Sequence, residues 1–390
     1  MYNVGFGDCF LLFLPTVEGL KKVAIDCGSL KNKTQSIRAI SDRLIADVTD
    51  SDGVPRIDVL VMSHRHADHI SGYTNAKWAD VEVGEVWMPW LESRENPDAR
   101  AIQKRQRASA QALAVAVQKL NLGQGLAEVA LNAQSNDDSL DVLHAGFAKK
   151  VLPRFFPSAT KVVEKIISSA LPGLEIFVLG PPHDHVALND PNPPDGQTLL
   201  TGYSADSLTG PLEKLRPFSG DWADEDAYWP DFDPTEIDRA ASRAEMYEIA
   251  AAKLDADINN TSLILIFRVG NDYLLFPGDA QWGPWEKILA DDEAVELLGK
   301  VTFLKVSHHA SHNGTPATLL RDVLGKANKR NSVVHAMISM TPFAQWEGIP
   351  HIPILTALNT LGFPYVVSDV LEDRDGFTRD EDFCFDLELS

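Results

Sequence analysis

The chain contains little cysteine, with three cysteines in 390 residues, at positions 9, 27 and 384. Cysteines so few and so widely spaced exclude a disulfide framework and a metal knot of the Cys-x-x-Cys kind. Each lies in an apolar, strand-like stretch, where a small buried side chain is expected. This use of cysteine is typical of a protein of the reducing cytoplasm.

Long apolar stretches are also absent, although hydrophobic residues make up 44% of the sequence. No apolar run reaches the about 18 to 20 residues that a transmembrane helix needs, so no membrane partner is expected. The first residues, MYNVGFGDCFLLFLP, have no basic region and place Asp8 within the apolar segment. They are typical of a buried strand rather than of a signal peptide.

Positive charge is scarce, because 35 Lys and Arg stand against 56 Asp and Glu, a formal net charge of −21. A broad basic face is therefore not expected, which disfavours extended duplex DNA as a partner. The local cluster of Lys104, Arg105 and Arg107 is best explained as a solvated helix face. A small substrate that carries phosphate remains open, since metal ions can hold it.

Strand and helix signals alternate along the chain, which predicts a layered α/β fold. Strands are indicated at residues 5–14, 21–29, 57–64, 83–89, 174–182, 301–309, 333–340, 364–370 and 383–389. Helices are indicated at 34–48, 98–121 and 353–362 by apolar residues at three- and four-residue spacing. Residues 262–279 predict a hairpin that turns at Gly270-Asn271-Asp272.

We expect a single domain, residues 1–390, with two insertions. Residues 96–172 form a mainly helical insertion, and residues 201–258 an acidic one that is helical from Pro234 onward. Residues 201–260 hold 14 Asp and Glu against 5 Lys and Arg. The acidic insertion is a solvated surface segment, a lid over a site or a docking surface for a protein partner, and the sequence leaves these alternatives open.

The stretch VMSHRHADHISGY places three of the chain's eleven histidines within six positions. His64 and His66 are two residues apart, so in an extended segment they project to the same side and can share one metal ion. The chain must then turn for Asp68 and His69 to face a second ion. Imidazole with carboxylate suits zinc, manganese or iron, and the lack of thiolates disfavours a closed structural zinc site.

Two later segments carry polar residues at strand ends. Asp279 follows an apolar strand and a Pro-Gly turn in LLFPGDAQW, and its two oxygens can bridge two cations. His308 and His309 follow another strand in LKVSHHASHNGT. One of these histidines can complete the second ion's ligands, while the other contacts a substrate oxyanion or protonates a leaving group. The residues alone do not separate the two roles.

Taken together and in this order, NVGFGDCFLL, VAIDCG, SHRHADH, LLFPGD and LKVSHHASH resemble the metallo-β-lactamase superfamily. Within it they are most similar to the hydrolase domain of ComEC-type DNA-uptake proteins and to its stand-alone relatives. The later HIP at His351 to Pro353 is similar to a His-Pro element of that group. The matching segments lie toward both ends of the chain, whereas residues 96–258 match poorly.

The resemblance implies a four-layer α/β (α+β) fold, the αββα metallo-β-lactamase sandwich: two packed mixed sheets, helices outside, and a dinuclear metal site at the sheet edges. It implies two divalent ions, with zinc expected first and manganese or iron as alternatives. The implied metal ligands are His64, His66, Asp68, His69, Asp279 and His308, with Asp68 and His309 as catalytic residues. Asp26 would be a structural carboxylate beneath the site.

One departure concerns the first ion. Many superfamily members carry a further histidine just before the hairpin that precedes the bridging aspartate, and this chain reads INNTSL there. Asn259 or Asn260 would then replace that histidine, or His183 or His185 would reach over from GPPHDH. We therefore expect weaker binding of the first ion by His64 and His66. In the second, milder departure, HHAS replaces His-His-Gly-Ser.

The expected activity is hydrolysis by a metal-activated hydroxide, with Asp68 orienting that hydroxide and accepting its proton. The ComEC-like motifs favour a phosphodiesterase that acts on a nucleotide, a small phosphodiester or single-stranded nucleic acid. One alternative is a hydrolase of a lactone, thioester or amide. Another is a non-catalytic scaffold for protein partners.

Overall fold

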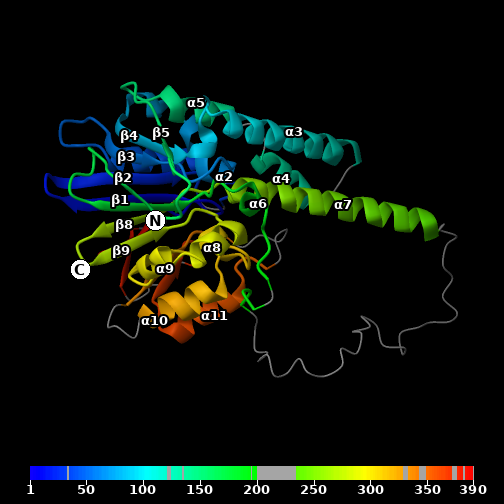
Figure 1. The fold of residues 1–390 in the computed structure, drawn as a ribbon. Helices are drawn as coiled ribbons and strands as arrows, with labels where there is room; N and C mark the ends of the chain where they lie inside the picture. The colour runs from blue at the N-terminus through cyan, green and yellow to red at the C-terminus, as the bar shows by residue number, and fades with distance from the viewer. Residues whose placement is uncertain are drawn as a thin grey trace.

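The computed structural model describes residues 1–32, 35–120, 124–133, 136–194, 196–199, 234–327, 333–341, 348–370, 376–380 and 383–389 (Figure 1).

Over these residues the fold is mixed α/β, as expected, and its strands form two large mixed sheets and a small hairpin. In spatial order, the first sheet contains β1 (Cys9–Thr16), β2 (Gly19–Cys27), β3 (Arg56–Val61), β4 (Glu82–Pro89) and β5 (Arg154–Phe156). The second contains β12 (Tyr365–Val367), β11 (His335–Ile338), β10 (Phe303–Lys305), β9 (Asp272–Phe276), β8 (Ile264–Val269), β7 (Glu175–Gly180) and β6 (Glu164–Ile166). The hairpin pairs β13 (Phe377–Asp380) with β14 (Cys384–Leu387).

Strand direction places the ends of several strands at common edges. In the first sheet β2, β3, β4 and β5 run parallel to one another. In the second sheet β9, β10, β11 and β12 are also parallel, whereas β8 pairs antiparallel with both β7 and β9. Because parallel strands have their carboxyl ends at one edge, the segments that follow β9, β10 and β11 lie close together.

The chain forms helices that pack on the outer faces of the two large sheets or extend beyond them. They are α1 (Ile37–Asp47), α2 (Ala67–Ile70), α3 (Pro97–Leu120), α4 (Gln124–Ala133), α5 (Asp137–Ala145), α6 (His185–Leu188), α7 (Pro234–Asn259), α8 (Trp282–Leu289), α9 (Asp292–Leu298), α10 (Gly325–Ala327) and α11 (Ile352–Leu361). One apolar cluster packs α1 on the first sheet, and another packs α8, α9 and α11 on the second. Among the described helices, not one combines the length and the apolar character that a membrane crossing requires.

The inner faces of the two sheets meet in a shared apolar cluster. The ring of Trp87, from β4, stacks on that of Phe267, from β8, with 6.2 Å between centroids and 8° between planes. Phe276, from β9, packs edge-on against Phe267 and against Phe10 of β1. The alternation of apolar residues along these strands therefore builds the core between the sheets.

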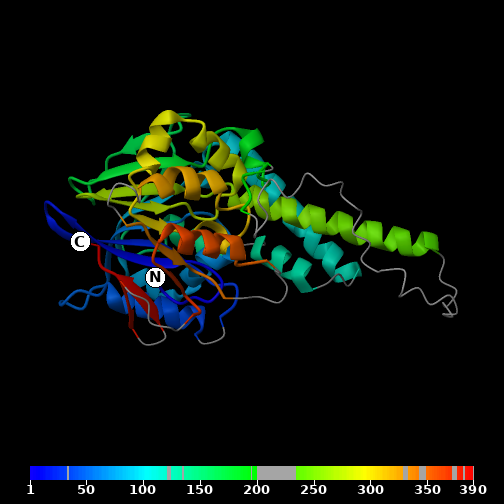
Figure 2. The same cartoon turned by 90° about the horizontal axis from the view of Figure 1, so that it is seen from below.

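The two expected insertions meet in one helical unit that extends beyond the strands (Figure 2). Buried side chains of α3, α4 and α7 share an apolar cluster, with Leu113, Ala130 and Leu254 among its members. The helical stretch is shorter than residues 96–172, because α5 ends at Ala145 and β5 and β6 follow. Helix α7 begins at Pro234 as expected, and residues 201–233 of the acidic insertion lie outside the described residues.

The expected strands, helices and hairpin are found at their predicted positions over the described residues. β8 and β9 pair around Val269 and Asp272, which confirms the hairpin. The N-terminal apolar run forms β1, with its partner β2. The three cysteines are free and buried.

The contact between the sheets predicts a large loss of stability for Phe267→Ala, because this side chain is fully buried. Removing it should lower the free energy of unfolding by about 3 to 5 kcal/mol. Phe13→Ala is the matched control, since Phe13 lies in β1 but is 48% exposed, and it should cost less than about 1 kcal/mol. Denaturant unfolding measures both, and equal losses would contradict the packing described.

Candidate metal centre

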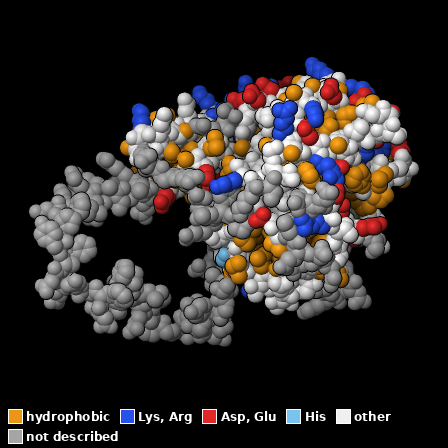
Figure 3. Space-filling view, turned by 180° about the vertical axis from the view of Figure 1, so that it is seen from behind, with side chains coloured by type: hydrophobic (Ala, Val, Ile, Leu, Met, Phe, Trp, Pro, Cys, Tyr) orange, Lys and Arg blue, Asp and Glu red, His pale blue; other side chains and the backbone are white. Residues whose placement is uncertain are grey.

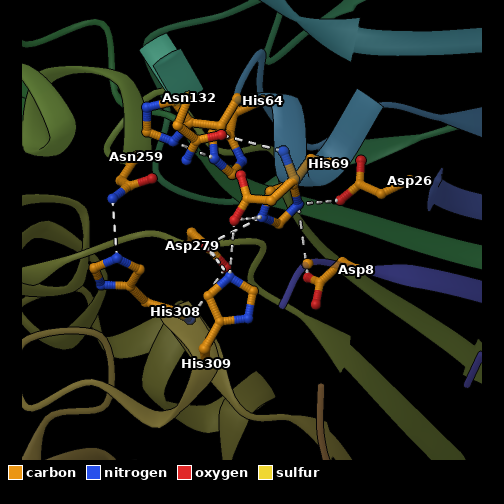
Figure 4. A network of polar contacts seen from close by, with 12 residues as sticks. Asp8, Asp26, His64, His69, Asn132, Asn259, Asp279, His308 and His309 are labelled. Atoms are coloured by element: carbon orange, nitrogen blue, oxygen red, sulfur yellow. Dashed lines mark hydrogen bonds and ion pairs between the residues drawn. The ribbon is translucent and has the colours of Figure 1, made fainter. Parts of the chain in front are cut away.

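Four buried side chains from three segments of the chain converge at the edge where the two sheets meet. They are Asp68, His69, Asp279 and His309, and one ligand atom from each lies within 4.8 Å of the others. Asp279 Oδ2 is 3.1 Å from His69 Nε2 and 3.1 Å from His309 Nε2. His309 Nε2 is also 3.2 Å from Asp68 Oδ2. Figure 4 shows the imidazoles of His69 and His309 approaching the Asp279 carboxylate from two sides.

Close backbone packing brings Asp68 and His69 to this point. Helix α2 lies directly on Gly28, where a Cβ would come within 2.4 Å of backbone atoms of Asp68 and His69. The backbone N–H of Asp8 donates to the Asp68 carbonyl at 3.0 Å. Glycine is therefore required in VAIDCG for steric reasons, since any side chain there would push the ligand-bearing turn away.

Asp26 lies beneath the cluster, as the resemblance implied. It adopts a left-handed backbone conformation with a φ of 54°. One carboxylate oxygen accepts the Ser63 backbone N–H at 2.7 Å, and the other lies 2.8 Å from His69 Nδ1. Asp26 thus fixes the orientation of the His69 ring, whose Nε2 is turned toward Asp279.

The two histidines after β10 point in different directions. His308, His309 and Ala310 all have positive φ, of 47°, 52° and 64°, an arrangement that non-glycine residues keep only where their surroundings hold it. The Nδ1–H of His309 donates to the Ser339 carbonyl at 2.7 Å, which turns Nε2 into the cluster. The ring of His308 instead lies beside Asn259, with 3.1 Å between Nε2 and Nδ2 (Figure 4).

This placement separates the two histidines, whose roles the residues alone left open. His309, assigned to catalysis by the resemblance, is the one with metal-ligand geometry, whereas His308, assigned to the metal, is not part of a described ligand group. The two side chains point in different directions because His308, His309 and Ala310 all have left-handed backbone angles, which turn the chain sharply at this point. The sequence could not distinguish them because they are adjacent.

His64 and His66 form a separate pair beside the cluster. His64 Nε2 is 3.1 Å from His66 Nδ1, a separation that two ligands of one ion can have. His64 Nδ1 faces the hydroxyls of Ser63 and Ser262 at 3.1 and 3.3 Å. His66 Nε2 is buried and has no hydrogen-bond partner among the described residues. The two rings therefore lie side by side next to the cluster.

Among the described residues, no hydrogen bond joins this pair to any of the four residues considered as a further ligand, although Asn259 Oδ1 is buried without a hydrogen-bond partner. Asn260 Nδ2 donates to two backbone carbonyls, and its oxygen accepts the backbone N–H of Gln281. Asn259 contacts His308 as described above. His183 stacks on Trp90 with 4.3 Å between ring centroids, and the exposed His185 begins α6.

Two residues of the site, Lys305 and Asp255, were missed from the sequence. Lys305 is 1% exposed, and its Nζ lies 2.9 Å from Asp279 Oδ1 and 2.5 Å from Asp8 Oδ2. A lysine within the apolar run VTFLKV was the signal for it. Asp255, from α7, lines the same cavity, and burial together with Asp68 and Asp279 raises its pKa to about 7. Nothing in the sequence distinguished Asp255 from the other acidic residues of that segment.

Opposite charges surround one another within the cluster. Burial lowers the pKa of His309, but Asp279 and Asp68 outweigh burial and raise it to about 10. The pKa of His69 is raised well above its ordinary value despite burial, because Asp279, Asp68, Asp8 and Asp26 surround it. Burial raises the pKa of Asp68, but His69 and His309 bring it down to about 2. Imidazolium and carboxylate therefore neutralise one another here.

The residues fit divalent cations on two independent observations. Two imidazoles and two carboxylates are the donor set that zinc, manganese and iron take. Besides His66 Nε2, Asp68 Oδ1 is buried without a hydrogen-bond partner among the described residues. Orphaned polar atoms of this kind are costly unless a ligand or ion satisfies them.

A cavity of about 1250 Å³ opens onto the cluster. Its lining includes Asp68, Asp279, His308 and His309, together with residues of α4 and α7. The cavity is large enough for a small organic substrate. The site thus combines a metal-ligand cluster with room for a second molecule.

No protein-family model matches this chain, and no curated protein matches it significantly.

His309→Ala and His308→Ala should separate the two histidines by metal content. Removing the His309 imidazole takes one ligand from the cluster and should reduce bound zinc by about one ion per chain after dialysis. His308→Ala, the adjacent control, should keep the wild-type content. Elemental analysis measures both, and the opposite result would restore the sequence-based assignment.

Zinc binding should release protons. His309, with its pKa of about 10, and His69 carry protons at pH 7, whereas a metal ligand must be neutral imidazole. Binding should therefore release about one to two protons per chain at pH 7, and zinc affinity should rise with pH. Calorimetry in two buffers of different ionisation enthalpy measures this release, and identical heats in both buffers would contradict it.

Proposed function

We propose that this chain is a metal-dependent hydrolase of the metallo-β-lactamase superfamily and acts as a phosphodiesterase on a nucleotide, a small phosphodiester or single-stranded nucleic acid. The observation that carries the proposal is the cluster of Asp68, His69, Asp279 and His309 beside a cavity. The order of the motifs, similar to that of ComEC-type hydrolase domains, supports the same assignment.

The arrangement of the sheets supports the αββα sandwich that this assignment requires. Two mixed sheets share an inner apolar cluster, and separate clusters pack helices on the two outer faces (Figure 1). The ligand-bearing segments follow β3, β9 and β10 at the sheet edges. Three free, buried cysteines support a reducing compartment, so we place the proposed reaction in the cytoplasm.

Two ions held by these residues would supply an acidified water as nucleophile and positive charge to stabilise the attacked ester oxygen. Asp68 would bind through Oδ2 and, through Oδ1, orient the attacking water and accept its proton. Its pKa of about 2 keeps it ionised at neutral pH, and Oδ1 is the oxygen without a partner. His308 and Asn259 line the cavity next to the ligands and would contact the substrate.

The charges around the cavity favour a small substrate. Among the described lining residues, Lys253 is the single lysine or arginine. On the face shown in Figure 3, basic and acidic side chains are interspersed rather than gathered by sign. Arg107 of the basic cluster pairs with Asp137 at 2.8 Å. These features suit a phosphodiester with one negative charge better than a long polyanion.

Hydrolysis of a lactone, thioester or amide is the second candidate function. Leu126, Val129 and Ile249 also line the cavity. This apolar wall would suit the acyl chain of an uncharged ester.

A substrate panel tests the proposal directly. Zinc- or manganese-loaded protein should hydrolyse bis-p-nitrophenyl phosphate, lose activity with a chelator and regain it when metal returns. Turnover of a chromogenic lactone alone would transfer the proposal to the second candidate. Full metal occupancy without turnover of any ester would refute a hydrolase and favour a scaffold for protein partners.

Asp68→Asn should lower turnover by about 10²- to 10⁴-fold while leaving the fold intact, because the amide cannot accept the proton. Asp292→Asn, at an exposed position of α9, is the matched control and should keep full activity. Steady-state assays measure both, and retained activity in Asp68→Asn would refute the role given to Asp68.

A further inference from the structure

Three of the histidines at the centre have both ring nitrogens engaged. In each, one nitrogen faces the centre and the other faces an oxygen outside it. For His69 the outer atom is Asp26 Oδ2 at 2.8 Å, and for His309 it is the Ser339 carbonyl at 2.7 Å. For His64 it is the hydroxyl of Ser63 at 3.1 Å. Such outer contacts fix the tautomer and the ring orientation of metal-binding histidines.

His66 is the exception. Its Nδ1 lies 3.1 Å from His64 Nε2, close to the about 3.3 Å expected for two nitrogens on one tetrahedral zinc. If His66 binds through Nδ1, its Nε2 must carry the proton and needs an acceptor. That nitrogen is buried without a hydrogen-bond partner among the described residues, and the ring is 2% exposed.

The carboxylate of Asp255 is positioned to be this acceptor. Its Oδ1 lies 3.9 Å from His66 Nε2, across the cavity wall. Its Oδ2 accepts a hydrogen bond from Asn259 Nδ2 at 2.8 Å, one turn later on the same helix. A small rotation about this anchored oxygen closes the gap of about 1 Å to hydrogen-bond distance.

We propose that Asp255 is the positioning residue of the first metal pair: its Oδ1 accepts the Nε2–H of His66 and so aims Nδ1 at the ion shared with His64. The inference rests on the metal centre of the proposed function and deepens it. Asp255 is not itself a ligand in this account, because its Oδ2 is held by Asn259 and its Oδ1 faces His66 Nε2, the ring nitrogen turned away from the shared ion.

His308 is the competing partner, and the contacts argue against it. His308 Nε2 is 3.8 Å from Asp255 Oδ2, but the amide of Asn259 already contacts both, at 3.1 and 2.8 Å. The oxygen Oδ1 is left for His66. Leu254 and Ile258 pack α7 against α3 and α4. The contact between Asp255 and His66 therefore connects this helical unit to the metal centre.

Two substitutions test the proposal by zinc affinity, measured by competition with a chromophoric chelator. Asp255→Ala should weaken one of two zinc sites by about 10- to 100-fold and leave the other unchanged. Asp255→Asn keeps an oxygen acceptor and should recover most of that affinity. Asp257→Ala, on the same helix but outside the cavity lining, is the control and should behave as wild type.

A double-mutant cycle identifies the affected site. In a His66→Ala background, Asp255→Ala should cause no further loss of zinc affinity, because its effect acts through His66. In the cobalt-substituted protein, Asp255→Ala should shift the visible absorption of the first site, whereas Asp255→Asn should shift it less. If Asp255→Ala does not fold, as judged by circular dichroism, Asp255→Asn decides: a loss of more than about 10-fold overturns the proposal.

The remaining outcomes are also decisive. Wild-type affinity for both ions in Asp255→Ala would overturn the proposal while leaving the proposed function intact. Equal losses in the Ala and Asn variants would make Asp255 a direct ligand and overturn its positioning role. A wild-type protein that binds no zinc would overturn this inference together with the metal centre.

Discussion

The carboxylate of Asp279 is the interaction on which the centre depends. It follows β9 of the second sheet, yet its Oδ2 lies 3.1 Å from His69, which follows β3 of the first. The same oxygen contacts His309, and Oδ1 contacts Lys305. One side chain therefore joins the two sheets at their polar edge, and the packing of Trp87 on Phe267 between the sheets sets how close that edge can be.

Burial makes this arrangement demanding. Asp8, Asp26, Asp68 and Asp279 are each at most 2% exposed, and such carboxylates are unfavourable without positive partners. Lys305 supplies one permanent charge, and raised pKa values let His69 and His309 supply more when they carry protons. Divalent ions would replace those protons with stronger positive charge, so the concentration of buried carboxylates favours metal binding.

Much of this fold could be predicted from the sequence, because apolar alternation and turn residues are local signals. The hairpin from Ile264 to Phe276 follows from a short motif, whereas the candidate ligands Asp68 and Asp279 were identified from several motifs taken together. The features that could not be predicted depend on backbone angles or on contacts between residues far apart in the sequence. The left-handed backbone angles at His308 and His309 turn His309, rather than His308, toward the cluster, and two adjacent histidines in a sequence do not reveal such angles. Asp255 lies nearly two hundred positions from His66 and reaches it only because α7 packs on α3 and α4.

The most direct test of the account is anomalous X-ray diffraction from zinc-soaked crystals. The account predicts a strong zinc peak about 2.0 to 2.2 Å from His69 Nε2, His309 Nε2 and oxygens of Asp68 and Asp279, with a weaker one between His64 Nε2 and His66 Nδ1. Zinc found only at surface histidines such as His185, with the buried cluster still closed by its own hydrogen bonds, would contradict the claim that this cluster is a metal centre.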